Sequence, residues 1–162
     1  MTLNSHKLLR FCTFFCFCDG AEARRSVRPE DRKPAKYSFE KRMQDCLTGG
    51  KIMIVKNEDC KVTACEPGVT RRVMSYCQEL MMCEITFEKG AVGNTHSHPH
   101  IQITYVAEGA FEFTIDGETQ IVKKGDSVLM PSGSVHGVKC LEAGKLVDVF
   151  NPMRETFIES ET

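Results

Sequence analysis

The sequence contains no tryptophan and no stretch of 18 or more consecutive apolar residues. A helix that spans a bilayer needs about 20 such residues, so a transmembrane helix is excluded. Neither sign of charge dominates, because 21 basic residues stand against 22 acidic ones. We therefore expect neither nucleic acid nor a membrane as a partner. The length of 162 residues fits one globular domain.

The charge is unevenly distributed along the chain. Residues 1–52 hold 11 basic and 6 acidic residues, a net charge of +5, whereas residues 53–162 hold 10 and 16, a net charge of −6. The first segment also lacks apolar periodicity, so it cannot bury enough apolar surface to offset the entropy lost on ordering. We interpret residues 1–52 as a poorly ordered basic extension and residues 53–162 as the folded domain.

Residues 7–23 resemble a secretory signal. Lys7 and Arg10 precede a short apolar run, and Ala21-Glu22-Ala23 resembles a cleavage site. The run covers only eight residues and three of them are cysteine, so we favour an extension without a targeting role.

The nine cysteines do not form the paired C-x-x-C motifs that are typical of zinc sites. An odd number, five, falls in residues 53–162, and Cys83 and Cys140 lie within apolar alternation, where free cysteine is a small buried hydrophobe. This usage favours a reducing compartment, and we expect a cytoplasmic protein.

From Val69 onward, apolar residues recur with a period of two between glycine-containing turns, which predicts short antiparallel strands and no helix. Asp116-Gly117 is typical of a type I′ hairpin. The pattern indicates an all-β sandwich or barrel. The predicted strands are 80–87, 101–106, 111–115, 119–123, 127–130, 136–140 and 146–150.

Four of the five histidines lie in this half. His96 and His98 are two residues apart, so on a strand they would project from one face, and Gln102 has the same parity. His136 begins a later strand, and antiparallel folding could bring this strand opposite His96 and His98. Three imidazoles and an amide oxygen suit a divalent metal. His100 follows a proline that interrupts the strand, and we interpret it as a residue behind the ligands or lining the pocket.

The spacing of these residues resembles the two cupin motifs. Residues 90–109 match G-x5-H-x-H-x3,4-E-x6-G with Gln102 in place of glutamate, and residues 125–136 match G-x5-P-x-G-x2-H. Cys140 stands where asparagine is usual. The resemblance implies a single double-stranded β-helix (jelly-roll) barrel, with the motifs in residues 90–136. It also implies a metal held by His96, His98, Gln102 and His136.

Residues 69–157 resemble the pectin-degradation cupins of the KdgF type, through HSHPHxQ, FEFTIDGE and LVDVFNPMRE. That resemblance implies an enzyme that opens the ring of 4,5-unsaturated uronates from pectin or alginate to linear 4-deoxy-5-keto uronates. It places pocket residues at Asp148, Phe150 and Arg154. Asp148 would act as general acid and base, Arg154 would hold the carboxylate, and Phe150 would form an apolar wall.

Two other functions stay open from the sequence. One is a cupin iron dioxygenase, which Gln102 disfavours because such sites commonly use a carboxylate ligand. The other is a cupin that binds a sugar acid without turning it over. The metal could be nickel, zinc, iron or manganese. We expect a homodimer, as is common for such barrels.

Overall fold

The structure is a computed structural model that describes residues 54–159. The extension predicted for residues 1–52 lies outside the described residues. Within them, no helix is long and apolar enough to cross a membrane. The described part begins with a 3-10 turn, η2 (Asn57–Asp59), and a short strand, β1 (Thr63–Ala64).

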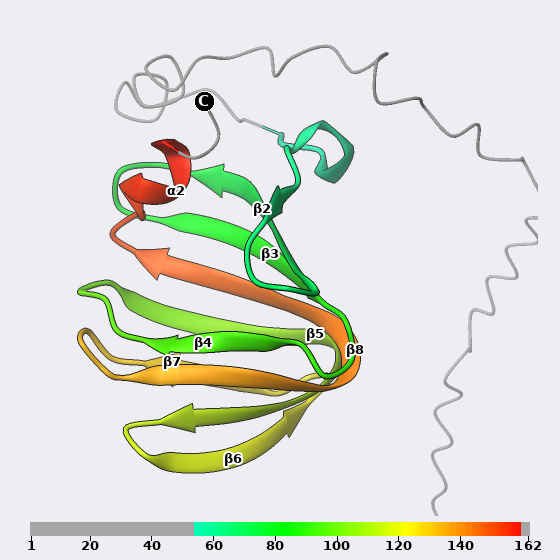
Figure 1. The fold of residues 1–162 in the computed structure, drawn as a ribbon. Helices are drawn as coiled ribbons and strands as arrows, with labels where there is room; N and C mark the ends of the chain where they lie inside the picture. Colours follow the sequence, from blue (N-terminus) through cyan, green and yellow to red (C-terminus); the bar gives the residue numbers. More distant parts are fainter. Residues whose placement is uncertain (1–53, 160–162) are drawn as a thin grey trace, which may run out of the picture. The chain divides into compact units, whose positions relative to one another are not determined.

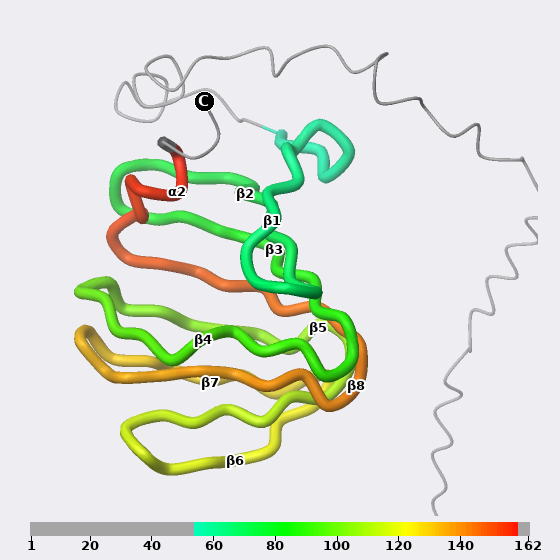
Figure 2. The backbone as a smooth tube through the Cα atoms, viewed as in Figure 1, coloured from blue at the N-terminus to red at the C-terminus, as the bar shows by residue number. Residues whose placement is uncertain are grey.

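Antiparallel strands make up nearly all of the rest (Figure 1). They are β2 (Val69–Tyr76), β3 (Met81–Phe87), β4 (Val92–His96), β5 (Ile101–Ile115), β6 (Glu118–Lys123), β7 (Ser127–Met130) and β8 (His136–Asn151). The chain then forms the short helix α2 (Glu155–Glu159). Figure 2 traces this last segment, in red, beside β2 and β3.

Two long strands, β5 and β8, take part in both layers of the barrel. The second half of β8 pairs with β3 and with the first half of β5, which also pairs with β7. The first half of β8 pairs with β4 and with the second half of β5, which also pairs with β6. Register shifts between Val106 and Phe111 bend β5 where it passes from one layer to the other. Figure 1 shows the matching bend of β8, in orange. This arrangement confirms the predicted all-β jelly-roll barrel.

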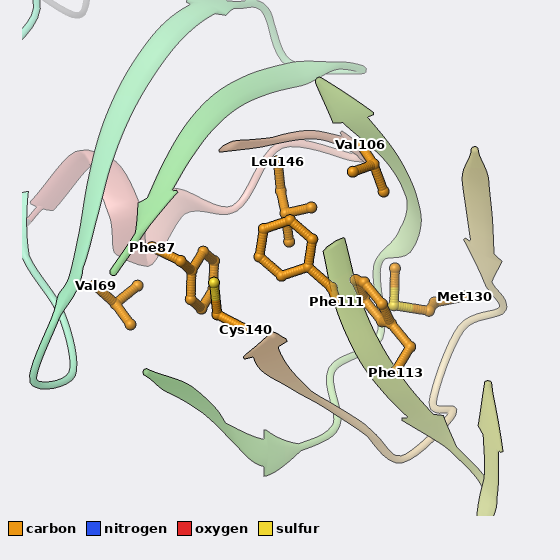
Figure 3. Close-up of a cluster of buried hydrophobic side chains, with 8 residues drawn as sticks. All are labelled: Val69, Phe87, Val106, Phe111, Phe113, Met130, Cys140 and Leu146. Atoms are coloured by element: carbon orange, nitrogen blue, oxygen red, sulfur yellow. The ribbon is translucent and has the colours of Figure 1, made fainter. Parts of the chain in front are cut away.

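Inward-facing apolar side chains form the main core between the layers (Figure 3). Phe111 is fully buried, and its ring meets that of Phe87 edge to face with centroids 5.4 Å apart. The remaining buried members are Val69, Val106, Phe113, Met130, Cys140 and Leu146. A second cluster joins β2, β3 and the end of β8 to α2, and it includes Met81, Phe150 and Ile158.

The structure differs from the sequence prediction in three places. Residues 101–106 and 111–115 are one strand rather than two, and so are residues 136–140 and 146–150. Strands β1, β2 and β4 were not predicted, and the expectation of no helix from Val69 onward is wrong at α2, which is too short for helical periodicity to show. The type I′ turn is confirmed, because Asp116 and Gly117 both have positive φ, 48° and 89°.

Candidate active site

Three histidine side chains converge within the barrel. Strand β4 ends at His96 and β8 begins at His136, and the two residues are partners in the strand register. The sequence interpretation that His96 and His98 share a strand is wrong, since His98 lies in the loop between β4 and β5. The loop nevertheless brings it to the pair: the three rings offer nitrogen atoms that all lie within 4.8 Å of one another. His100 is not part of this group.

Backbone carbonyls fix the orientation of the three rings. The Nδ1 atoms of His96, His98 and His136 each contact one carbonyl oxygen, and a carbonyl only accepts, so each Nδ1 donates. In a neutral imidazole the lone pair is then on Nε2. Burial is the main cause that lowers the pKa of His98 and of His136, which favours the neutral form. The carbonyls belong to Asn94, His100 and Ser134, at 2.7, 3.1 and 2.9 Å respectively.

A hydrogen-bonded chain connects Gln102, whose side chain lies beside His98, to a buried carboxylate. The Thr104 hydroxyl donates to Asp148 Oδ1 at 2.6 Å and accepts from the Gln102 amide nitrogen at 3.0 Å. The amide oxygen of Gln102 must then point the other way, and it lies 3.0 Å from Nε2 of His98. Register pairing of Thr104 on β5 with Asp148 on β8 holds this chain in place.

The arrangement fits a divalent metal. Nε2 of His98 and Oε1 of Gln102 both carry lone pairs, and two acceptors 3.0 Å apart need a cation between them. Donor atoms about 2.1 Å from one octahedral ion are about 3.0 Å apart. Nε2 of His136 is buried and has no hydrogen-bond partner within residues 54–159. Three imidazoles and one amide oxygen are therefore oriented as a ligand set.

Asp148 is the most strongly perturbed carboxyl group of the site. It is buried, and burial raises its pKa to about 6, although bonds from Thr104 and Gln102 and the charge of Arg154 oppose the rise. A carboxyl group with a pKa near neutrality can both give and take a proton at physiological pH. The sequence expectation that Asp148 and Phe150 face one side of their strand agrees with the burial of both.

Phe150 and Arg154 complete the predicted set. The Phe150 ring meets the His98 ring edge to face at 5.7 Å, and the Arg154 guanidinium carbon lies 5.3 Å from the Phe150 ring centre. Nε of Arg154 is buried without a hydrogen-bond partner within the described part of the chain. Burial is also the main cause that lowers the pKa of Arg154, which nonetheless stays charged at neutral pH.

Most of these groups, with the exception of His98, border a pocket of about 290 Å³. His96, Gln102, His136, Asp148, Phe150 and Arg154 all contribute to its lining. Among the further lining residues that sequence reasoning missed are Thr104, Arg71 and Phe157. Thr104 has the inward parity of Gln102, a signal that could have found it. Arg71 and Phe157 belong to no motif, and only the fold brings them here.

Known proteins with similar sequence and structure support the same reading of the fold. The cupin domain family matches residues 83–150. Over 93 residues the chain is 43% identical to the pectin degradation protein KdgF of Dickeya dadantii (strain 3937), covering 56% of this chain and 84% of that protein.

Two solved structures share the architecture. KdgF from a Halomonas species superposes with a TM-score of 0.63 at 33% identity, over 66% of this chain and 99% of that one. An RmlC-like cupin from Shewanella frigidimarina superposes with a TM-score of 0.63 at 36% identity, over 66% of this chain and 96% of that one. At these identities and coverages the likeness extends beyond the fold.

Proposed function

The chain belongs to the KdgF family of cupin proteins, and on that basis we propose that it is a metal-dependent enzyme of pectin or alginate breakdown. Its substrate is a 4,5-unsaturated uronate, and its product is the linear 4-deoxy-5-keto uronate. The observation that carries this proposal is the hydrogen-bonded chain Gln102–Thr104–Asp148, which lies between His98 and the buried Arg154 in the same site. The proximity of a candidate ligand set, a titratable carboxyl group and a cation suited to a substrate carboxylate supports the proposal.

The substrate dictates what the residues must do. The unsaturated ring is an enol ether, so opening requires a proton on C4, the oxygen of a water molecule on C5, and cleavage of the bond between C5 and the ring oxygen. The electron pair of that bond stays on the ring oxygen, which takes a proton. The steps therefore need a proton donor and a proton acceptor, and one titratable group can fill both roles in turn.

Asp148 is the group that we assign to this proton transfer. Its pKa of about 6 lets it protonate C4 and later take a proton from the C5 hydroxyl. Arg154 binds the substrate carboxylate through paired N–H groups, and Phe150 lies against the ring as an apolar wall. A divalent ion held by His96, His98, Gln102 and His136 supplies Lewis-acid polarisation of substrate oxygens when bound.

Loss of ultraviolet absorbance by a freshly generated 4,5-unsaturated uronate tests this proposal. The sugar also opens spontaneously, so metal-loaded protein is compared with chelated protein and with buffer. We expect metal-dependent acceleration over buffer. A rate equal to that of buffer, with metal demonstrably bound, would overturn the proposed reaction. Uronate binding without product, or oxygen consumption by the iron-loaded protein, would then identify a sensor or an oxygenase.

The proposal also includes the extent of the catalytic domain, the cellular location and the metal. We propose residues 53–162 as the catalytic domain, and we propose a cytoplasmic location from the cysteine usage of the sequence. The metal identity is left to elemental analysis.

We also propose a homodimer. The outer face of β5 and β7 carries exposed Ile101, Ile103, Tyr105 and Leu129, an apolar surface of the kind that subunits bury. Sedimentation velocity measures the mass of the particle and decides between monomer and dimer.

A further inference from the structure

A second arginine, Arg71 of β2, lies on the wall of the same pocket. Only 9% of its surface is exposed, and its guanidinium carbon lies 3.6 Å from the centre of the Phe157 ring. The guanidinium carbon of Arg154 lies 4.1 Å from the centre of that same ring. One aromatic ring of α2 therefore contacts two arginines that come from distant parts of the sequence.

Phe157 itself is held firmly. Its ring meets the Phe150 ring edge to face at 5.7 Å, and its neighbour Ile158 is buried in the cluster with Met81. Stacking on a fixed ring restricts the rotamers of a long side chain, so each guanidinium is pre-oriented before a ligand arrives. Phe157 thus acts on the pocket through the two arginines that it contacts.

The charges around the pocket favour an anionic ligand at this place. Arg71 and Arg154 repel each other, and the charge of Arg71 contributes to lowering the pKa of Arg154. The acidic residues that line the pocket are Glu66, which is partly exposed, and Asp148, whose oxygen is already bonded to Thr104. A ligand anion that bonds to both guanidinium groups would offset this repulsion.

We infer that Arg71 is a specificity-determining residue that binds the substrate carboxylate together with Arg154, and that Phe157 is the positioning residue for both. The inference deepens the proposed function and rests on it. A carboxylate has about four lone-pair positions, enough to accept two N–H groups from each guanidinium. The pocket would thereby select a free uronic acid over its neutral ester.

Arg72 provides a matched control on the same strand. It faces the opposite side of β2, where its guanidinium lies 3.3 Å from Glu84, and it does not line the pocket. Arg72→Gln removes the same charge one residue away without touching the pocket. A general effect of lost charge or of a weakened β2 would appear in both variants.

Steady-state kinetics with the unsaturated uronate and its methyl ester test the inference. For Arg71→Gln we expect KM for the free acid to rise about ten- to hundredfold with little change in kcat, and KM for the ester to stay the same. Arg71→Lys keeps the charge but loses the forked geometry, so its KM should fall in between. Phe157→Leu should raise KM for the acid and not for the ester. Arg72→Gln should leave both unchanged.

Two results would overturn the inference: an unchanged KM for the acid in Arg71→Gln, or an equal rise for acid and ester. Failure of the proposed function gives a different result, since the wild-type protein then shows no metal-dependent ring opening. In that case calorimetric titration with glucuronate replaces kinetics. Weaker binding by Arg71→Gln than by Arg72→Gln supports the anion site, and equal binding refutes it.

Discussion

The two halves of β5 place opposite kinds of side chain inside the barrel. In the first half, polar Gln102 and Thr104 are buried while Ile103 is 48% exposed. In the second half, Phe111 and Phe113 are buried and the residues between them are less so. The register shifts between the halves change which parity points inward. A single strand thus builds the site with one half and the core with the other.

The comparison shows that the first half of β5 buries polar, site-forming side chains where the second half buries apolar core side chains. A buried polar group is costly unless it has hydrogen-bond partners, and Gln102 and Thr104 have them in each other and in Asp148. The second half contributes apolar area and aromatic contacts instead. Substitutions in the first half should therefore change function more than stability, and those in the second half should do the reverse.

The largest effect is expected at the metal ligands. His98→Ala should reduce bound metal from about one ion per chain to nearly none and remove metal-dependent ring opening, because it deletes a ligand beside Gln102. His100→Ala is the matched control, since this neighbouring histidine lies outside the group and the variant should keep its metal. Elemental analysis after gel filtration measures both. Equal metal loss in the two variants would contradict the assignment.

Asp148→Asn should lower turnover about 10²- to 10⁴-fold, the range for loss of a general acid or base. The amide is nearly isosteric and can still accept the hydrogen bond from Thr104, so the metal content should be unchanged. The ultraviolet assay under saturating substrate measures the effect. Turnover equal to that of the wild type would remove the proposed role of Asp148.

Substitutions in the second half of β5 should reduce stability more than function. Phe111→Ala should lower the free energy of unfolding by about 3–5 kcal/mol, because it opens a cavity beside Phe87 in the main core. The fraction that remains folded should keep its metal. Urea unfolding followed by fluorescence or circular dichroism gives the stability. A small loss, below about 1 kcal/mol, would mean that the core collapses around the gap.

The sequence predicted the residues of the candidate site more accurately than it predicted the strand boundaries. Spacing located the four proposed ligands, because two motifs constrain positions that the fold then brings together. The same reasoning divided β5 and β8, since residues 107–110 interrupt the alternation and a bulge leaves no pattern of period two. Strand β4 was not predicted because its residues, VGNTH, are mostly exposed and do not alternate between apolar and polar side chains.

Long-range contacts account for what the sequence could not supply. Arg71 precedes Phe157 by more than 80 residues, and nothing near either residue signals that a ring and a guanidinium meet at 3.6 Å. Thr104 differs, because its polar side chain occupies an inward position between Gln102 and Val106. An inverted alternation of this kind, with polar residues inside and apolar residues outside, was readable in the sequence and marks the site.

A pH series on the chelated protein sharpens the comparison further. Since the native pKa of Asp148, about 6, lies above its ordinary value of 3.8, the folded state holds the proton more tightly. The stability that this proton contributes is complete below about pH 4 and is lost as the pH rises through 6. Asp148→Asn has no such loss, so it should gain on the wild type by on the order of 3 kcal/mol between pH 4 and 7.5. Parallel stability profiles would show that the carboxyl group is not perturbed.

The substitution with the smallest expected effect is at Thr104, and it tests whether this residue links Gln102 to Asp148. Thr104→Val keeps the shape of the side chain but removes the donor to Asp148 and the acceptor for Gln102. Because the Thr104 bond lowers the pKa of Asp148, its loss should raise that pKa and move the acidic limb of the rate profile to higher pH.

Turnover of Thr104→Val at neutral pH should fall about tenfold, the effect of one lost hydrogen bond to a charged group. Thr104→Ser, which retains the hydroxyl, is the control and should keep the wild-type pH profile. A valine variant with the wild-type profile would separate Asp148 from the metal ligands, and the polar half of β5 would then hold two independent groups rather than one connected chain.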